Sequence, residues 1–315
     1  MSDPAGSDAL ARILARAPGL AGRSVDVELA APGVASPSYH AVESTTFRLV
    51  VAGEPGGFLK VTEPAIRDLI DLSASFEAAG AAAARGLAPA PLALFEEEGA
   101  ILFEDLGADW RPARMDDLRR DDRLAGVLDA YGVFADGPAL SRSWSVFDGV
   151  ETMWRLLGSD ADTLPPDAWW LKRWTDAIGE AIVAAGVDLR PAHNDPHASN
   201  LMLGPDGGLR LVDFDMAANS DPYHQIGALL NEAFQFDSEM ARALEIYEGA
   251  SRPASLARCR AYAAADDFYW GLRSLLLDRL SPHASLEFRK YAGWRFLRCR
   301  MLVGRPGFEE TLRSL

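Results

Sequence analysis

A group of polar residues near residue 200 has the types and spacing that phosphoryl transfer needs. A stretch interrupted by prolines holds His193, Asp195 and Asn200, and two short apolar runs that read as a hairpin lead to Asp213. The reaction needs a carboxylate that orients or deprotonates the attacking hydroxyl, and oxygen ligands for the Mg²⁺ that bridges the ATP phosphates. A hairpin returns its second strand to the loop before its first, so Asp195, Asn200 and Asp213 are predicted to face one cleft.

Lys60 is the second residue with a chemical signature. It ends an apolar, strand-like run and is the first of three lysines, before Lys172 and Lys290. In a kinase, a lysine at the end of such a strand neutralises the phosphates of the nucleotide. An acid on the following helix should pair with it, and Glu77 is the preferred candidate, with Asp71 as the other.

Histidines in and after the same stretch leave a metal hydrolase as an alternative. His193, Asp195, His197 and His224 offer nitrogen and oxygen ligands for zinc. The chain has no His-Glu-x-x-His helix, however, and Pro196 opposes a helical pair of ligands. A non-catalytic nucleotide-binding protein is a further alternative, which we disfavour because the four residues predicted for catalysis and phosphate binding are all present.

The elements that must position these residues fall into two groups along the chain. The period-two pattern predicts strands near residues 25–29, 46–51, 56–61, 90–94 and 100–103, and helical spacing predicts helices at 8–17 and 65–86. Beyond residue 107 the pattern is helical near 116–136, 144–158, 167–185 and from 222 onward, with the hairpin at 201–212 between. We therefore predict an α+β class with two lobes, an N-terminal antiparallel-sheet lobe over 1–106 and a larger helical lobe over 107–315.

Composition and charge exclude several classes of function. The chain has 315 residues, 49% of them hydrophobic, which is enough for a full core. The net charge of −15 would repel nucleic-acid backbones and anionic lipid, so neither is an expected partner. Acids outnumber bases 40 to 19 in residues 1–250, whereas residues 251–315 hold 12 bases and 6 acids. With no membrane-spanning run and no apolar leader at the N-terminus, we expect a cytoplasmic protein.

The chain resembles the aminoglycoside phosphotransferase/choline kinase superfamily, and its choline/ethanolamine kinase branch most closely. The likeness covers about residues 25–300 and rests on the stretches 193–200, 211–215, 221–232, 247–249 and 266–270. It implies a two-lobed, protein-kinase-like fold that uses ATP and Mg²⁺ to phosphorylate a hydroxyl of a small molecule.

The resemblance also implies roles for individual residues. For catalysis and metal binding these are the base Asp195 and the ligands Asn200 and Asp213. For the nucleotide they are Lys60 with its partner Glu77, the loop residues Ser44 and Thr45, and the adenine-binding hinge from Glu104 to Leu106. For the acceptor and its ammonium group they are Asp215, Glu232, Trp270 and Tyr223.

Departures from the family pattern bear on the loop and on the acceptor. The nucleotide loop near 33–44 lacks the usual glycine-rich form, and Ser44, Thr45 and Thr46 stand there. Phosphate contacts are then expected from the backbone N–H groups of these three residues. Gln225 stands where the family has an Asp that braces the catalytic loop, and Arg273 replaces a second Trp of many choline kinases. If Arg273 faces the pocket, it would repel an ammonium and favour an anionic acceptor or a neutral polyol. Choline or a similar amino alcohol is the leading acceptor, an aminoglycoside or another metabolite alcohol the alternative, and the protein is expected to be a monomer or a homodimer.

Overall fold

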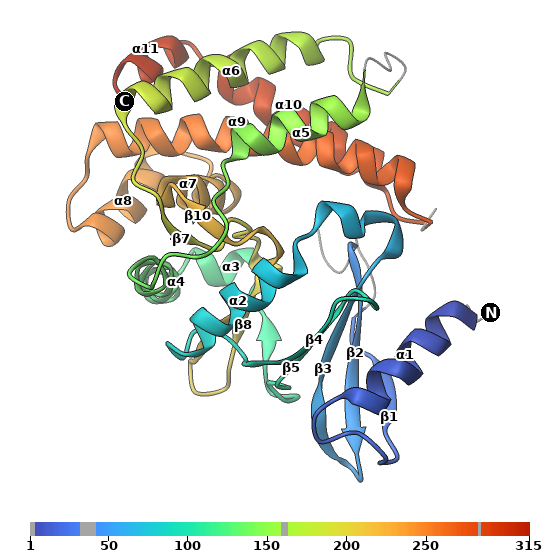
Figure 1. Ribbon diagram of the computed structural model, residues 1–315. Helices are drawn as coiled ribbons and strands as arrows, with labels where there is room; N and C mark the ends of the chain where they lie inside the picture. The colour runs from blue at the N-terminus through green and yellow to red at the C-terminus, as the bar shows by residue number, and fades with distance from the viewer. Residues whose placement is uncertain (1–3, 32–41, 159–162, 283–284) are drawn as a thin grey trace.

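The computed structural model describes residues 4–31, 42–158, 163–282 and 285–315 and separates a sheet-rich from a helix-rich part (Figure 1). A five-stranded antiparallel sheet runs in the order β1-β2-β3-β5-β4. Its strands are β1 (Asp26–Leu29), β2 (Ser44–Val51), β3 (Glu54–Thr62), β4 (Pro91–Phe95) and β5 (Ala100–Phe103). This confirms the predicted sheet. We call residues 4–103 the sheet lobe and the remainder the helical lobe.

Two helical segments of the sheet lobe differ in their role. Helix α1 (Pro4–Arg16) packs apolar side chains, Ile13 among them, on one face of the sheet. The single helix predicted over 65–86 is instead a 3-10 turn, η1 (Pro64–Leu69), followed by α2 (Leu72–Ala83). The break occurs because the Asp71 carboxylate caps α2, accepting a hydrogen bond of 3.0 Å from the Ala74 N–H.

The helical lobe is built around one long buried helix. The helices of this lobe are α3 (Met115–Leu118), α4 (Asp121–Ala135), α5 (Val146–Leu157), α6 (Ala168–Ala185), α7 (Pro222–Ala233), α8 (Asp237–Glu248), the long buried helix α9 (Pro253–Leu280), α10 (Phe288–Val303) and α11 (Phe308–Arg313). Helix α9 is buried on all sides between Cys259 and Leu277, where α5, α7 and α10 pack on it (Figure 1). A helix apolar all round has no solvent face, so its few polar residues must find partners inside the protein.

Short strands hold the polar stretch near residue 200. The predicted hairpin is β8 (Leu201–Leu203) with β9 (Leu209–Leu211), and β6 (Arg111–Pro112) pairs with β8. A separate pair, β7 (Arg190–Ala192) and β10 (Ala218–Ser220), fixes the residues just before and just after this stretch. Strands β6, β7 and β10 were not predicted, because two or three residues show no period and, unlike β8 and β9, they do not flank a turn rich in Gly, Pro and Asp.

The apolar core of the helical lobe includes residues of the sheet lobe. Val42, Ile66 and Ile70 are buried in the same cluster as α9 side chains. The two lobes are therefore joined by packing as well as by the chain after β5, and the boundary predicted between 106 and 107 stays a prediction. No described helix is long and apolar enough to cross a membrane.

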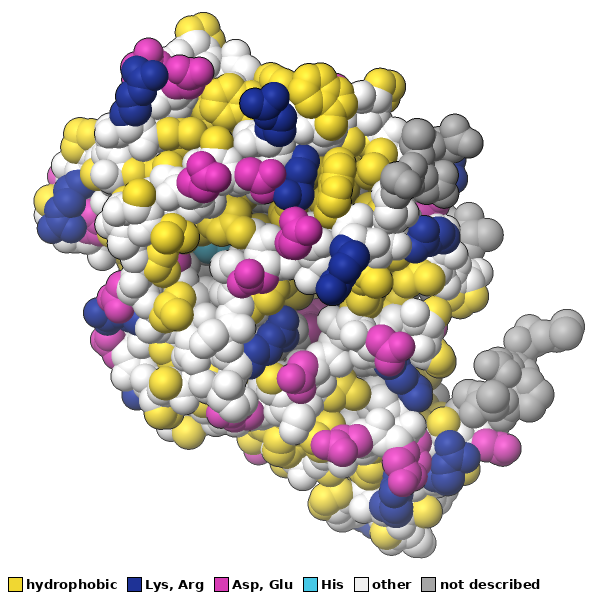
Figure 2. Space-filling model, turned by 45° about the horizontal axis from the view of Figure 1, so that its top comes forward, with side chains coloured by type: hydrophobic (Ala, Val, Ile, Leu, Met, Phe, Trp, Pro, Cys, Tyr) yellow, Lys and Arg dark blue, Asp and Glu magenta, His cyan; other side chains and the backbone are white. Residues whose placement is uncertain are grey.

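Among the described residues, six of the twelve basic residues of the C-terminal segment 251–315 form ion pairs with acids of residues 1–250, and others pair with acids of their own segment. Examples are Arg258 with Asp221, Arg260 and Arg305 with Asp237, and Arg300 with Asp167. Figure 2 shows the result on one face, where basic and acidic side chains are interspersed. Folding thus evens out part of the uneven charge along the chain.

Candidate active site

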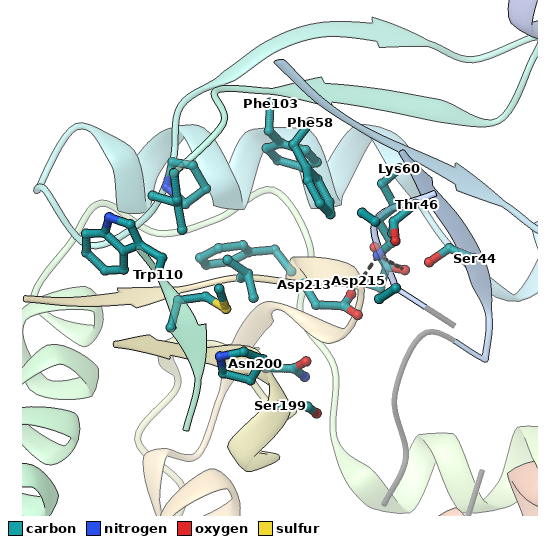
Figure 3. Close-up of a pocket in the computed structure, with 18 of the residues that line it drawn as sticks. Ser44, Thr46, Phe58, Lys60, Phe103, Trp110, Ser199, Asn200, Asp213 and Asp215 are labelled. Atoms are coloured by element: carbon teal, nitrogen blue, oxygen red, sulfur yellow. Dashed lines mark hydrogen bonds and ion pairs between the residues drawn. The ribbon is translucent and has the colours of Figure 1, made fainter. Parts of the chain in front are cut away.

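A cavity of about 300 Å³ lies between the two lobes and takes residues from both (Figure 3). Phe58, Phe103 and Trp110 are among its apolar walls, whereas Lys60 lies among acids at the other side. A cavity with flat apolar walls beside a charged cluster suits a ligand that has an aromatic ring at one end and phosphates at the other.

Lys60 forms the centre of the charged cluster. Its Nζ is 2.6 Å from Asp213 Oδ1 and 2.6 Å from Asp215 Oδ2. Burial alone would lower the pKa of Lys60, but the two carboxylates outweigh it and hold the pKa above its usual value. Burial would likewise raise the pKa of Asp213, but Lys60 holds it below its usual range, whereas burial keeps the pKa of Asp215 raised. One cation between two carboxylates leaves a net negative charge, which a bound metal ion can balance.

The predicted pairing of Lys60 with Glu77 is wrong. The Glu77 carboxylate accepts a 3.0 Å hydrogen bond from the Ser141 N–H and another from the Ser141 hydroxyl. Ser75 faces the cluster instead and donates to Asp215 Oδ1 at 3.2 Å. Positions 75 and 77 are separated by about 200° around a helix, so only one of them can face the site. Asp71, the other candidate, is engaged in capping α2.

Two residues of the candidate site have left-handed backbone conformations. Asn194, before Asp195, has a φ of 63°, and Asp213, after β9, has a φ of 67°. Such conformations cost free energy for residues other than glycine, and they concentrate at functional sites where the surroundings enforce them. The Asn194 side chain is held by the Met216 carbonyl and the Ser220 hydroxyl, each at 3.1 Å.

Gln225 braces the loop before Asp195, at the position where the resemblance leads us to expect an Asp. Its Oε1 accepts hydrogen bonds from the backbone N–H groups of His193 at 2.9 Å and Asn194 at 3.4 Å. A neutral amide therefore holds the loop before Asp195. Its Nε2 is buried without a hydrogen-bond partner among the described residues.

The loop presents Asp195 and Asn200 to the cavity together with Asp213. The Asn200 amide nitrogen donates to the Asp195 carbonyl at 3.2 Å, so the amide oxygen remains to bind a ligand. This oxygen and the Asp213 carboxylate, which is 39% exposed, are donors of the kind Mg²⁺ prefers. Burial raises the pKa of Asp195 to about 6, an effect that the nearby His197 opposes. A base whose pKa lies near the working pH suits proton transfer.

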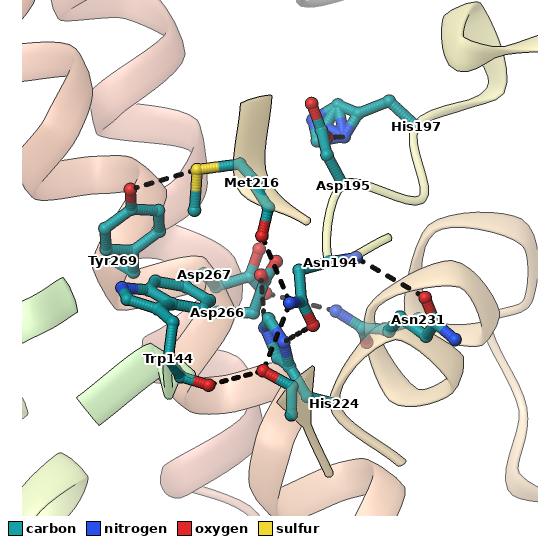
Figure 4. A network of polar contacts seen from close by, with 12 residues as sticks. Trp144, Asn194, Asp195, His197, Met216, His224, Asn231, Asp266, Asp267 and Tyr269 are labelled. Atoms are coloured by element: carbon teal, nitrogen blue, oxygen red, sulfur yellow. Dashed lines mark hydrogen bonds and ion pairs between the residues drawn. The ribbon is translucent and has the colours of Figure 1, made fainter. Parts of the chain in front are cut away.

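The histidines do not assemble a zinc site. His193 Nε2 is 2.9 Å from the Val212 carbonyl, and His224 Nε2 is 3.0 Å from Asp266 Oδ1 (Figure 4). Within the described ranges, no group of three or more His, Cys, Asp or Glu could hold a metal ion. These observations count against the hydrolase alternative. Burial lowers the pKa of His193 to about 4, which suits a neutral brace rather than a proton carrier.

The end of the cavity nearest α9 contains an ion pair between the lobes. Glu43 and Trp270 both line the cavity, and the Arg273 Nε donates to Glu43 Oε1 at 2.7 Å. The Arg273 guanidinium is 2% exposed, lies 5.8 Å from the Trp270 ring centre and also contacts the Tyr269 hydroxyl. Arg273 is therefore behind the cavity wall with its charge matched by Glu43. It does not present a cation that would repel an ammonium.

Two residues predicted for the acceptor lie outside the lining of this cavity. The Tyr223 hydroxyl donates to Glu248 at 2.8 Å, and Tyr223 lines a separate cavity with Arg258 and Tyr247. Glu232 is half-buried near the end of α7 and is also absent from the lining. Trp270 and Asp215 do line the cavity, and their role with the acceptor stays a prediction.

The predicted nucleotide residues are brought together only in part. Ser44 lines the cavity, but the Thr45 hydroxyl donates to Glu63 at 3.0 Å and is not in the lining. Thr46, two positions after Ser44 on the same face of β2, lines it instead, and its hydroxyl has no partner among the described residues. The alternation of side chains along a strand could have identified it. Residues 33–41 of the predicted nucleotide loop lie outside the described residues.

The predicted hinge follows β5 along the cavity edge. Glu104, Asp105, Leu106 and Gly107 all line it. The Glu104 N–H donates to the Ala90 carbonyl at 2.9 Å, and Asp105 is held by Arg48 at 2.7 Å. In the described part of the chain, the Leu106 N–H and carbonyl make no hydrogen bond to other backbone groups. They are thus suited to pair with the edge of a purine.

The chain is similar to known phosphotransferases in sequence and in fold. A sequence model described as the phosphotransferase enzyme family (APH) matches residues 30–262. No curated protein matches the chain in sequence. A choline/ethanolamine kinase family protein from Mesorhizobium loti shares the fold at 22% identity, with a TM-score of 0.78 and 98% of each chain covered.

Two further solved structures place the fold in the same group. LicA, the choline kinase of Streptococcus pneumoniae, in its complex with AMP has a TM-score of 0.76 at 15% identity, covering 96% of this chain and 99% of its own. A putative aminoglycoside phosphotransferase from Ralstonia eutropha has a TM-score of 0.58 at 15% identity, with 98% of each chain covered. The two-lobed, protein-kinase-like α+β fold predicted from the sequence is thereby confirmed.

Proposed function

Because the chain belongs to the phosphotransferase enzyme family, we propose that it transfers the γ-phosphoryl group of ATP to a hydroxyl of choline or a similar amino alcohol. The observation that carries this proposal is the convergence of Lys60, Asp213, Asn200 and Asp195 on one cavity. The AMP bound to LicA supports a nucleotide in the equivalent place. A cytoplasmic location and a monomeric or homodimeric state are further predictions.

The reaction follows from the roles that the geometry permits. The Asp195 carboxylate takes the proton of the acceptor hydroxyl as its oxygen bonds to the γ-phosphorus, and the bond from that phosphorus to the β–γ bridging oxygen breaks. The products are a phosphate ester, ADP and a proton. Lys60 neutralises phosphate charge, and the Asn200 amide oxygen with the Asp213 carboxylate would hold Mg²⁺. When bound, Mg²⁺ supplies charge neutralisation on the phosphate oxygens.

The charges around Asp195 favour an acceptor that carries a positive group. Asp195 itself, together with Asp213 and Asp215, which share the single cation of Lys60, leaves a net negative charge beside the cavity. The Trp270 ring lies in the same cavity, and aromatic faces attract ammonium groups. Since Arg273 is paired with Glu43 behind the wall, the acidic character is not cancelled by a free guanidinium at this place.

An aminoglycoside or another metabolite alcohol is the second candidate acceptor. The structural likeness to the putative aminoglycoside phosphotransferase of Ralstonia eutropha supports this alternative. An aminoglycoside also carries ammonium groups beside hydroxyls, so the same charge argument applies to it. The two differ in size, and activity across acceptors of graded size would separate them.

The test is acceptor-dependent ADP release with Mg-ATP, measured across amino alcohols, aminoglycosides and sugars. The expected result is release with an amino alcohol and its loss in Asp195→Ala, by about 10²- to 10⁴-fold in kcat. The affinity of Asp195→Ala for Mg-ATP should stay within about threefold of the wild type, because the carboxylate is not placed on the nucleotide.

Two outcomes would contradict the proposal. Full turnover in Asp195→Ala would remove the carboxylate from catalysis. Binding of Mg-ATP with no acceptor-dependent ADP release from the wild type would instead favour the non-catalytic alternative. Asp206→Ala is a matched control, because Asp206 lies exposed in the turn between β8 and β9.

A further inference from the structure

His197 lies two residues after Asp195 and is contacted on three sides. Its Nδ1 is 3.2 Å from Asp195 Oδ1, although the two atoms are not aligned for a hydrogen bond. Its Nε2 is 3.2 Å from the Tyr291 hydroxyl. Its ring packs against Trp270 with centroids 5.2 Å apart and an angle of 48° between the planes. Figure 4 shows the imidazole beside the Asp195 carboxylate. A side chain held in this way has little freedom to turn.

We propose that His197 is a positioning residue for phosphoryl transfer, and that Tyr291 acts through it. The Tyr291 hydroxyl donates to His197 Nε2, so that Nδ1 carries the ring proton and donates to Asp195 Oδ1 once a bound acceptor aligns the carboxylate with the ring. The other carboxylate oxygen is then directed at the acceptor hydroxyl. The proposal rests on the proposed function, in which Asp195 takes the proton of the acceptor.

The tautomer follows from what the two ring nitrogens face. A neutral imidazole has one N–H donor and one acceptor. The carboxylate of Asp195 can only accept, whereas the Tyr291 hydroxyl can donate, so Nδ1–H toward Asp195 satisfies both contacts. Polar contacts of this kind in an enzyme without its substrate often align fully only once the substrate binds.

The residues behind Tyr291 make this arrangement rigid. The Arg295 guanidinium lies 5.8 Å from the Tyr291 ring centre and is 2.5 Å from Asp266 Oδ2. Asp266 also contacts His224, whose other nitrogen is 3.3 Å from Asn194 Oδ1. Since Asn194 precedes Asp195, the contacts lead from α10 through α9 and α7 back to the catalytic loop. The orientation of Asp195 is thus determined from both sides.

Substitutions that keep one of the two nitrogens distinguish positioning from simple packing. An asparagine at 197 places an amide N–H near the position of Nδ1, whereas a glutamine reaches toward Nε2. His197→Asn should therefore retain the contact with Asp195, and His197→Gln should lose it. A residue that only fills space would show no such preference.

The experiment measures acceptor-dependent ADP release by the full-length wild type, His197→Asn, His197→Gln and Tyr291→Phe. We expect kcat to fall about 10- to 100-fold in His197→Gln. In His197→Asn, kcat should stay within about fivefold of the wild type. The KM for ATP should change less than about threefold in both. In Tyr291→Phe, kcat should fall about five- to tenfold, because the ring is then held by fewer contacts.

Tyr262→Phe is the matched control for Tyr291→Phe. Tyr262 is also buried on a helix of this lobe, and its hydroxyl donates to Asp221 at 2.9 Å, outside the cavity lining. Its kcat should match that of the wild type. Thermal melting of every variant separates a loss of positioning from a loss of folding.

A second measurement needs no turnover. In the resting protein, ¹⁵N–¹H spectra of the five histidines should show one ring, absent from His197→Asn, with its proton on Nδ1. A proton on Nε2 of that ring, or wild-type kcat in His197→Gln, would overturn the inference and leave the proposed function standing. A wild type that turns over no acceptor would overturn the proposed function itself.

Discussion

The end of the cavity where we propose that the nucleotide binds (the nucleotide end) and the end proposed for the acceptor (the acceptor end) balance their charges in different ways. At the nucleotide end, one lysine faces Asp213 and Asp215, and the cluster keeps a net negative charge. At the acceptor end, Glu43 is matched by Arg273 inside the protein. The charge of the first group is balanced only when a cation binds, whereas the charge of the second group is already balanced within the protein. Substitutions should therefore reduce activity most at the nucleotide end and stability most at the acceptor end.

Among the substitutions that test this comparison, Asp213→Ala at the nucleotide end should lower the activity most. We expect kcat to fall about a thousandfold, because a proposed metal ligand is lost. The free energy of unfolding should change by less than about 1 kcal/mol, since Lys60 keeps Asp215 as a partner. Coupled ADP release and urea unfolding measure the two quantities. A large loss of stability with activity retained would reverse the comparison.

Arg273→Gln tests the acceptor end. Its removal leaves the Glu43 carboxylate without its cation in a mostly buried place, and we expect a loss of about 3 kcal/mol in the free energy of unfolding. The double variant Glu43→Gln/Arg273→Gln should recover part of that loss, because no buried charge is then uncompensated. Urea unfolding of the two single variants and the double variant gives the coupling. Strictly additive effects would show that the pair does not act as a unit.

Lys60→Met sharpens the comparison within the nucleotide end. We expect the affinity for Mg-ATP to weaken by about 1.5–3 kcal/mol, because a charge-assisted contact to phosphate is lost. The KM for the acceptor should change little. Lys172→Met is the control, since Lys172 pairs with Glu151 and Asp176 on the surface of the helical lobe. Calorimetric titration with Mg-ATP measures the affinity, and equal effects in both variants would contradict the assignment.

Gln225→Met should have the smallest effect and lies between the two ends. The backbone N–H groups of His193 and Asn194 would lose their buried acceptor, which costs about 1–2 kcal/mol of stability. We expect kcat to fall about threefold, because Asp195 follows directly on this loop. Thermal melting and ADP release measure both. The exposed Gln235→Met should be neutral, and an equal effect there would rule out a specific brace.

The meeting of Asp195, Asn200 and Asp213 at one cavity could be predicted because their spacing is local. Asp195 and Asn200 share one loop, and a hairpin returns Asp213 to it, so a short stretch of sequence determines their meeting. The five strands of the sheet lobe could be predicted for the same reason, since alternation and turn residues are local signals.

The orientations of α2 and α7 explain why some predicted site residues do not reach the cavity. Glu77 faces Ser141 because the capping residue Asp71 sets where α2 begins and hence which side it turns to the site. Tyr223 and Glu232 are nine residues apart on α7, which is about two and a half turns, so they cannot both face one pocket.

Partners far apart in the chain could not be predicted. Glu43 and Arg273 are 230 residues apart, and His197 and Tyr291 are 94 apart. Neither pair has a motif, because each member is an ordinary residue of its own element. Such contacts depend on how α9 and α10 pack, which no pattern in a single sequence encodes.

The burial of Val42, Ile66 and Ile70 among the α9 side chains has a consequence for how such chains recombine. The visible division into two lobes follows secondary structure, but it is not a division into units that fold alone. A chimera joined at residue 106 would graft three foreign side chains into the recipient's core. Exchange of nucleotide specificity between relatives is therefore expected to succeed only when these three positions are chosen to fit the recipient's long helix.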